Sequence, residues 1–353
     1  MNIVDYVRMT KDITFEEDPL NEVDSLIFSQ IAYFNFEIFN GRTSIEISEM
    51  ENKKEIDRLV ERTWDQKNNK LLIRQLSHSR RFKNIVIHNP INIFSFDEEQ
   101  QFSAISFELP NNIMYISFRG TNSTFVGWKE DFNMTYLDTI PSQRSALLYL
   151  EKASKLFECD FYLGGHSKGG NLAMYAGAFF KEQSRVLQVF NHDGPGLNSF
   201  LKGAAEYQSV QRKFQKFVPE ASIIGMLIES GNDFLVIKSN ASLFMQHNPY
   251  TWQVNGNKFH KLASVNALSD YSRRTVLTLL QSVDIESRKE FVSSLYEIST
   301  STNAEYLVDA IKPNSENVKS VFKSIRNAVK SRKILIRVTK LIVKASIHQL
   351  KTT

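Results

Sequence analysis

The stretch that decides the fold lies at residues 161–178 and reads Phe-Tyr-Leu-Gly-Gly-His-Ser-Lys-Gly-Gly-Asn-Leu-Ala-Met-Tyr-Ala-Gly-Ala. Residues 161–163 form a short apolar run typical of a buried strand, and residues 171–180 have the composition of a helix. Between them lies a G-x-S-x-G pentapeptide centred on Ser167. In this context the pentapeptide predicts a sharp strand-to-helix turn that exposes the serine hydroxyl, a nucleophile elbow.

Two glycines, Gly165 and Gly169, flank the serine two residues before and two residues after it. The predicted turn is so tight that side chains at these positions would collide, so only hydrogen fits there. The helix that follows would point its N-terminal N–H groups at Ser167 and favour negative charge nearby. A G-x-S-x-G alone is a weak signal, because Gly-rich turns that only pack also contain it, but the flanking strand and helix strengthen it.

Composition limits the class of protein. The 353 residues, 42% apolar and 12% aromatic, suffice for one large domain or two modest ones. The single cysteine, Cys159, excludes an internal disulfide framework and is typical of a reducing compartment. We find neither the apolar core of a signal peptide nor the ~20 apolar residues of a membrane span. These features predict a soluble cytoplasmic protein.

The order of the patterns along the chain predicts an α/β fold with a mostly parallel sheet and helices on both faces. One domain is expected over residues 1–312, and residues 313–353 form a basic tail. Within the domain we expect a helical segment at 1–80, a sheet core at about 84–260 and helices from 261. Helices are expected at 24–39, 50–76, 142–157 and 171–180, and a helix or covering loop at 198–217. Strands are expected at 84–88, 91–96, 102–109, 113–118, 161–163, 186–190, 221–228 and 233–238.

A serine hydroxyl needs a base that takes its proton and a third group that orients the base. Hydrolases built on such an elbow supply them in the chain order serine, acid, histidine. His247, on a loop after the last strand candidates, is the expected base. His192 comes too early for that order, and His348 lies in the basic tail.

The acid has three candidates in the sequence. Asp193 directly follows the strand expected at 186–190, in the turn sequence Asn-His-Asp-Gly-Pro-Gly at 191–196, and is the preferred acid. Asp233, which follows Gly-Asn, and Glu220 are the alternatives.

Stabilising the oxyanion requires two N–H groups. One belongs to Lys168, the residue after the nucleophile. The other is expected from the loop Arg-Gly-Thr at 119–121, which ends the strand expected at 113–118.

A resemblance to a known family rests on these and neighbouring residues. Phe-Arg-Gly-Thr at 118–121 and Gly-Trp-Lys-Glu-Asp at 127–131 are similar to the Arg-Gly-Ser/Thr…Trp-x-x-Asp segment of class 3 (fungal-type) lipases. His-Asn-Pro-Tyr-Thr-Trp at 247–252 resembles the histidine-to-tryptophan segment of the same superfamily. With Asn-Ile-Val-Asp-Tyr at 2–6 and Asn-Glu-Val-Asp at 21–24, the whole chain resembles a bacterial branch of lipase-like proteins.

The resemblance implies an α/β-hydrolase fold in which Ser167 is the nucleophile and His247 the base. It further implies that Thr121 supplies the second oxyanion donor and that Asp131 braces the oxyanion loop. The acid departs from the pattern. Class 3 lipases carry it in an Asp-x-Val-Pro segment, where this chain has Ser-Ile-Ile-Gly at 222–225, and this absence favours Asp193. The turn that holds Asp193 also stands where those lipases carry a Gly-x-Pro-Arg turn, so a structural role for Asp193 stays open.

The expected function is therefore that of a serine carboxylester hydrolase acting on a lipidic or acylated substrate. No cofactor or metal is expected, because the sequence has no Walker loop, no G-x-G-x-x-G, no zinc-type Cys/His cluster and no His-Glu-x-x-His. The alternative from another class is a non-catalytic interaction module that keeps the fold. The sequence indicates neither which ester is cleaved nor the oligomeric state.

The net charge of +4 comes from the tail, since ten Lys or Arg and no Asp or Glu lie between Lys319 and the last residue. Apolar residues recur among these cations at helical spacing, which predicts a basic amphipathic helix. Such a helix favours either peripheral contact with anionic lipid at the inner membrane surface or packing on the domain. Nucleic-acid binding is not expected.

Overall fold

The computed structural model describes residues 1–39, 41–52, 55–122, 124–228 and 233–300. The described chain divides into two compact units, of which the first comprises residues 1–93, 102–120 and 142–269. The second comprises residues 94–101, 121–141 and the described chain from residue 270 onward. Ser167, Asp193 and His247 therefore belong to the first unit, whereas Thr121 and Asp131 belong to the second.

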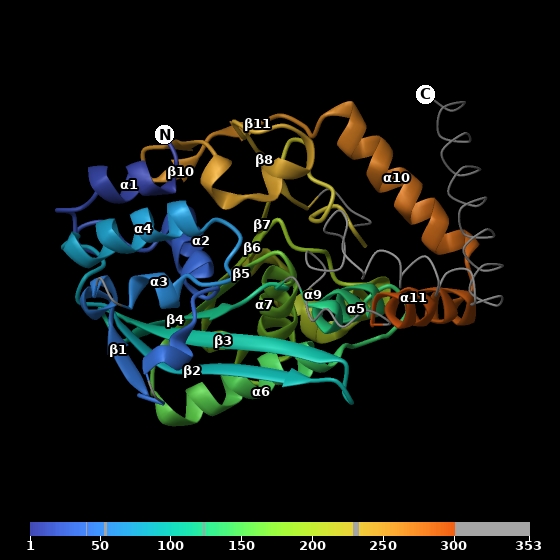
Figure 1. Cartoon of the computed structure of the whole chain (residues 1–353), viewed down its shortest axis with the longest axis horizontal. Helices are drawn as coiled ribbons and strands as arrows, with labels where there is room; N and C mark the ends of the chain where they lie inside the picture. The colour runs from blue at the N-terminus through green and yellow to red at the C-terminus, as the bar shows by residue number, and fades with distance from the viewer. Residues whose placement is uncertain (40, 53–54, 123, 229–232, 301–353) are drawn as a thin grey trace. The chain divides into compact units, whose positions relative to one another are not determined.

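A nine-stranded mixed sheet runs through the described chain in the order β1-β2-β3-β4-β5-β6-β7-β8-β11 (Figure 1). Its middle strands, from β4 to β8, pair in parallel. Antiparallel pairs flank them, β3 with β4 on one side and β8 with β11 on the other. The strands are β1 (Ser44–Glu46), β2 (Val86–Ser95), β3 (Gln100–Leu109), β4 (Ile113–Phe118), β5 (Asp160–His166), β6 (Val186–His192), β7 (Phe214–Pro219), β8 (Leu235–Ile237) and β11 (Lys261–Leu262). A separate hairpin joins β9 (Val254–Asn255) to β10 (Lys258–Phe259).

Helices cover both faces of the sheet. A Cβ built on Gly164 of β5 would touch Ser25 of α2, whereas one built on Gly165 would touch Gly169 of α7. Because successive strand residues point to opposite faces, α2 and α7 lie on opposite faces, as the sequence predicts. The helices of the first unit are α1 (Ile3–Met9), α2 (Glu22–Ile31), α3 (Ile56–Leu59), α4 (Gln66–His78), α6 (Pro141–Leu156), α7 (Lys168–Phe179), α8 (Ser199–Gly203) and α9 (Ala205–Val210). α5 (Phe125–Asn133) and α11 (Ile285–Thr300) belong to the second unit, and α10 (Ala267–Ser282) begins at the end of the first.

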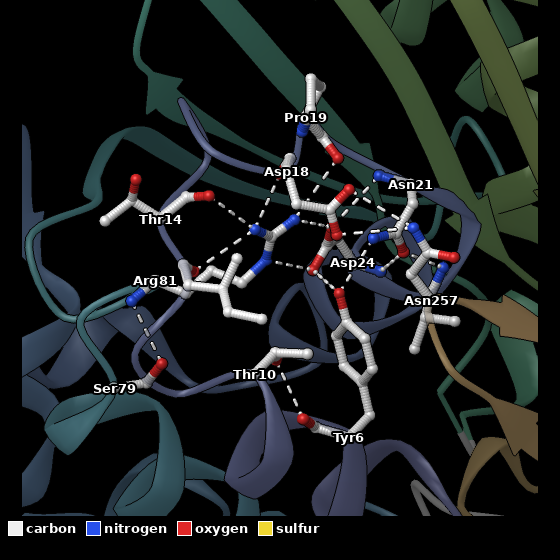
Figure 2. Close-up of polar contacts among 12 residues, drawn as sticks. Tyr6, Thr10, Thr14, Asp18, Pro19, Asn21, Asp24, Ser79, Arg81 and Asn257 are labelled. Atoms are coloured by element: carbon white, nitrogen blue, oxygen red, sulfur yellow. Dashed lines mark hydrogen bonds and ion pairs between the residues drawn. The ribbon is translucent and has the colours of Figure 1, made fainter.

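A buried ion pair fastens the N-terminal helices to one another (Figure 2). Arg81, which follows α4, donates to both carboxylate oxygens of Asp24 in α2 over 3.0 and 2.5 Å. Its other amino group donates to the backbone carbonyls of Asp18 and Thr14 over 2.8 and 3.1 Å. Burial opposes the positive charge, but the hydrogen bond and charge of Asp24 outweigh it and raise the pKa of Arg81.

Several predicted elements of the N-terminal half differ in the structure. The helix predicted at 24–39 ends at Ile31, and the helix predicted at 50–76 is divided among a 3₁₀ turn (Ile47–Glu51), α3 and α4. The predicted helical segment 1–80 also contains the short strand β1. Two predicted strands, 84–88 and 91–96, form the single strand β2, because Asn89 takes a positive φ of 48° within the strand instead of ending it.

In the C-terminal half, the strand predicted at 221–228 is wrong. The strand β7 lies earlier, at Phe214–Pro219, and overlaps the end of the segment 198–217 predicted as a helix or covering loop. The helices α8 and α9 lie in the earlier part of that segment. Residues 221–228 form turns instead, and one of them, Gly225, donates its N–H to Asp193. Helices predicted from 261 begin only at Ala267, after β11.

The basic tail at 313–353 lies outside the described residues. Among the residues that are described, no helix is long and apolar enough to cross a membrane. The same residues contain no group of three or more His, Cys, Asp or Glu side chains that could hold a metal ion.

Candidate active site

Ser167 occupies the turn between β5, which ends at His166, and α7, which begins at Lys168. Its backbone has φ 57° and ψ −135°, a conformation that side chains with a Cβ rarely adopt. The Ser167 N–H donates to the carbonyl of His192 and its carbonyl accepts from Gly170, each over 2.9 Å. The surrounding backbone therefore holds the serine in a strained turn, which is common where strain serves function.

Gly165 and Gly169 let three backbone segments meet beneath this turn. A Cβ on Gly165 would collide with the backbone of Gly169 and with the carbonyl oxygen of Phe118. A Cβ on Gly169 would collide with the same carbonyl. Only hydrogen fits at either position, because the obstacles are backbone atoms that cannot swing aside.

Asp193 follows β6 directly and, at φ 51°, also has a positive φ. Its carboxylate accepts three hydrogen bonds: from Nδ1 of His247 over 2.7 Å, from Oγ of Ser222 over 2.5 Å and from the N–H of Gly225 over 3.2 Å. The carboxylate side chain is 1% exposed. Three donors satisfy a buried carboxylate and fix its orientation.

His247 ends a short 3₁₀ helix, Leu243–His247, and its side chain is 20% exposed. Because a carboxylate only accepts, Nδ1 must carry the proton of this contact, which leaves a lone pair on Nε2 of the neutral ring. Gln246 holds the turn: its side chain accepts from the N–H of Ala221 and donates to the carbonyl of Ala241, and its own carbonyl accepts from Trp252. His247 thus combines a fixed backbone with a ring nitrogen suited to take a proton.

The other candidates for acid and base lie elsewhere. Asp233 is exposed and precedes β8. The backbone N–H of Glu220 donates to the carbonyl of Ile237, and its carbonyl accepts from the N–H of Asn266. The carboxylate that contacts His247 is that of Asp193. His192 is buried, its Nε2 lies 2.8 Å from Oγ of Ser25, and burial lowers its pKa to about 3. It is therefore a neutral core residue.

The two candidate oxyanion donors fall in different units. Lys168 is the first residue of α7, directly after Ser167, and is 1% exposed. Thr121 belongs to the second unit, where its hydroxyl donates to the carboxylate of Asp131 over 2.7 Å. Asp131 thereby fixes the side chain of Thr121 within that unit.

Three residues that the sequence analysis did not select lie around the candidate site. Ser222 donates to Asp193, and His166 contacts the carbonyl of His247 over 2.9 Å. The hydroxyl of Tyr33 lies 3.1 Å from Nδ1 of His166. Only Ser222 had a signal in the sequence, because it stands in the segment where class 3 lipases carry their acid.

The serine turn, set in a mostly parallel sheet with helices on both faces, defines an α/β-hydrolase, here of the class 3 lipase-like superfamily. A family model described as Mbeg1-like matches residues 76–297. The chain therefore belongs to the Mbeg1-like family, a lipase-like family. A search of curated proteins gives no match to the sequence.

Solved structures with some similarity are fungal lipases. The Rhizomucor miehei lipase in a propeptide complex is 17% identical, with 54% of this chain and 64% of that chain covered and a TM-score of 0.35. A mutant form of MDLA from Penicillium cyclopium is 11% identical, with 69% and 87% covered and a TM-score of 0.41. Another fungal lipase is 12% identical, with 70% and 88% covered and a TM-score of 0.42. The chain thus spans less than two thirds of the R. miehei lipase chain.

Proposed function

We propose that this protein is a serine carboxylester hydrolase that acts on a lipidic or acylated ester. Ser167 is the nucleophile, His247 the general base and Asp193 the acid that orients it. The observation that carries the proposal is the 2.7 Å contact between Nδ1 of His247 and Asp193, in the same unit as the strained turn of Ser167.

The reaction follows from the proton positions. Nε2 of His247 takes the hydroxyl proton as Oγ of Ser167 attacks the ester carbonyl, and Asp193 stabilises the imidazolium that forms. The tetrahedral intermediate collapses when His247 gives this proton to the leaving alkoxide, so an alcohol departs and an acyl-serine remains. Water, deprotonated by the same ring nitrogen, then attacks the acyl group and releases the acid and the free serine.

The developing oxyanion would be stabilised by backbone N–H groups of Lys168 and Thr121. Lys168 begins α7, so its N–H belongs to the first turn of that helix, where negative charge is favoured. For Thr121 the support is the motif at 118–121 and the hydrogen bond that Asp131 accepts from its side chain.

A fluorophosphonate probe tests the proposal directly, since it labels a serine only when that serine is activated. We expect the protein to be labelled and to hydrolyse p-nitrophenyl esters, and Ser167→Ala to abolish both. Loss of a triad member typically costs on the order of 10⁴–10⁶ in rate. Ser209→Ala, on the exposed face of α9, is the matched control and should keep full labelling. Undiminished turnover by Ser167→Ala would refute Ser167 as the nucleophile, and an intact protein that is never labelled and does not turn over ester would favour the non-catalytic module.

We also propose that the basic tail binds anionic lipid, which would bring the enzyme to a surface that contains its substrate. The support is its sequence, ten cations without an acidic residue from Lys319 onward. Each basic residue near an anionic surface contributes roughly 1 kcal/mol, and salt screens this attraction beyond ~8 Å. Removal of residues 317–353 should abolish co-sedimentation with anionic vesicles and leave the melting temperature unchanged. A large drop in melting temperature, with no vesicle binding by the intact protein, would instead assign the tail to packing on the domain.

A further inference from the structure

Hydrogen bonds connect the loop that carries His247 to the segment directly after α2, with His166 between them. Tyr33, two residues after that helix, places its hydroxyl 3.1 Å from Nδ1 of His166. The other ring nitrogen of His166, Nε2, lies 2.9 Å from the backbone carbonyl of His247. The two imidazole rings also contact one another in a tilted arrangement, with centroids 4.4 Å apart and an angle of 37° between their planes. Tyr33, His166 and His247 thus form one hydrogen-bonded chain from the N-terminal segment to the base.

The proton positions in this chain are fixed by its last acceptor. A carbonyl oxygen only accepts, so Nε2 of His166 must carry the proton and Nδ1 must accept from Tyr33. The hydroxyl of Tyr33 also lies 3.4 Å from the carbonyl of His166, which would be the acceptor in the opposite arrangement. That arrangement puts the proton on Nδ1 and sets the lone pair of Nε2 against the carbonyl of His247 at 2.9 Å, which is repulsive.

His166 is suited to this task because it stays neutral. Its side chain is buried, and burial together with the neighbouring His247 holds its pKa well below the usual value. A charged ring this close to His247 would oppose the imidazolium that forms there during catalysis.

A second set of contacts joins the same N-terminal segment to the same loop. Asn69 of α4 accepts hydrogen bonds from Gln30 of α2 over 2.9 Å and from the hydroxyl of Tyr250 over 2.6 Å. Asn248, directly after the base, donates to Asp65 over 3.0 Å. Asn248 and Tyr250 are therefore bonded directly to the N-terminal segment, and His247 is connected to it through His166. Most of that segment precedes the part of the chain matched by the family model.

We propose that Tyr33 and His166 are positioning residues that set the place of His247 relative to Ser167, and this inference rests on the proposed function. His166 is the chain neighbour of the nucleophile and binds the backbone of the base. A shift at His166 would therefore change the distance between the two reacting groups, and a misplacement of about 1 Å can cost about 10²-fold in rate.

Four variants test this role. Tyr33→Phe removes the donor to Nδ1, and we expect kcat to fall about 10-fold; His166→Phe also removes the donor to His247, with an expected loss of about 10²-fold. His166→Gln restores a donor and an acceptor on one side chain and should recover most of the loss. Tyr6→Phe is the matched control, because Tyr6 lies in the same N-terminal segment but bonds Asp24 instead of the base loop. It should lower the melting temperature and leave kcat unchanged.

The ¹⁵N shifts of the His166 ring provide a readout that needs no turnover. We expect the Nε2–H form in the wild type and also in Tyr33→Phe, because the carbonyl of His247 still accepts from Nε2. In Tyr33→Phe the Nδ1 resonance should move to that of an acceptor without a hydrogen bond. An Nδ1–H form in the wild type, or full kcat in both Tyr33→Phe and His166→Phe, would overturn the proposal. Failure of the proposed function is separate, since an unlabelled Ser167 in the fluorophosphonate assay would leave the ring form of His166 measurable.

Discussion

Two buried carboxylates in the same unit, Asp24 and Asp193, have opposite relations to their partners. The side chains of Asp24 and Arg81 are both completely buried, and the second amino group of the guanidinium donates to backbone carbonyls. Asp193 is just as buried, but its partner His247 is 20% exposed and has one ring nitrogen outside the contact. In the first pair both side chains are buried, whereas in the second the carboxylate is buried and the imidazole is partly exposed to solvent.

This difference separates a structural pair from one that can do chemistry. Arg81 is always protonated, so its pair with Asp24 can hold helices together but cannot move a proton. Histidine changes charge near neutral pH, and a fixed carboxylate on one nitrogen prepares the other nitrogen to take and return a proton. Burial and charge alone do not distinguish the two carboxylates. The distinction lies in the partner: His247 is partly exposed, and its Nε2 is not used in the contact with Asp193.

The largest expected effect that tests this comparison comes from Asp193→Asn. The amide cannot hold the proton of His247 on Nδ1 in the same way, and a misoriented or wrongly protonated imidazole costs about 10⁴ in rate. Asp233→Asn is the matched control, since Asp233 is exposed and does not contact His247. Hydrolysis of p-nitrophenyl esters by the two variants decides between them. An inactive Asp233→Asn beside an active Asp193→Asn would assign the acid to the later strand.

Breaking the buried pair of Asp24 and Arg81 should lower the free energy of unfolding and leave the rate unchanged. Arg81→Met leaves Asp24 buried without its counter-charge, and breaking such a pair typically costs about 3–5 kcal/mol of unfolding free energy. Urea unfolding measures the loss, and the rate per labelled Ser167 should stay at the wild-type value wherever the protein is folded. Arg81→Lys keeps a charge but not the paired hydrogen bonds, so its unfolding free energy should lie between those of the wild type and Arg81→Met. A folded Arg81→Met with wild-type stability, or with a lowered rate per labelled site, would remove the distinction between the pairs.

Local sequence was sufficient for the part of the fold that carries the serine. β4 spans the predicted strand at 113–118, and α6 begins one residue before the predicted 142. α7 begins at Lys168, inside the pentapeptide and three residues before the predicted 171. The steric need for Gly165 and Gly169 is local too, which is why the G-x-S-x-G pattern is informative. The preference for Asp193 came from its place at the end of a strand and from the absence of an Asp-x-Val-Pro segment at 222–225. Its role as the acid stays a prediction that the contact with His247 supports.

The sequence was insufficient where a residue acts through partners far along the chain. The apolar run at 221–228 has the composition of a strand, yet it forms turns whose Ser222 and Gly225 hold Asp193. Tyr33 and His166 are 133 residues apart. His166 stands in the G-x-S-x-G pentapeptide, but nothing in the local sequence indicates that it contacts Tyr33 and the backbone of His247. Long-range hydrogen bonds of this kind leave no periodicity in the sequence, so only the structure reveals them.

The smallest expected effect concerns Ser222, which donates to the carboxylate oxygen of Asp193 that does not contact His247. In Ser222→Ala, the N–H of Gly225 still serves that oxygen. The loss is then one hydrogen bond to a charged group, and we expect kcat to fall about 10-fold with little change in stability. If Ser222 acts only by orienting Asp193, the substitution should have no further effect in an Asp193→Asn background, and this double-mutant cycle isolates the coupling. Equal losses in both backgrounds would show that Ser222 acts elsewhere, and the carboxylate would then need only His247 and Gly225 to hold its place.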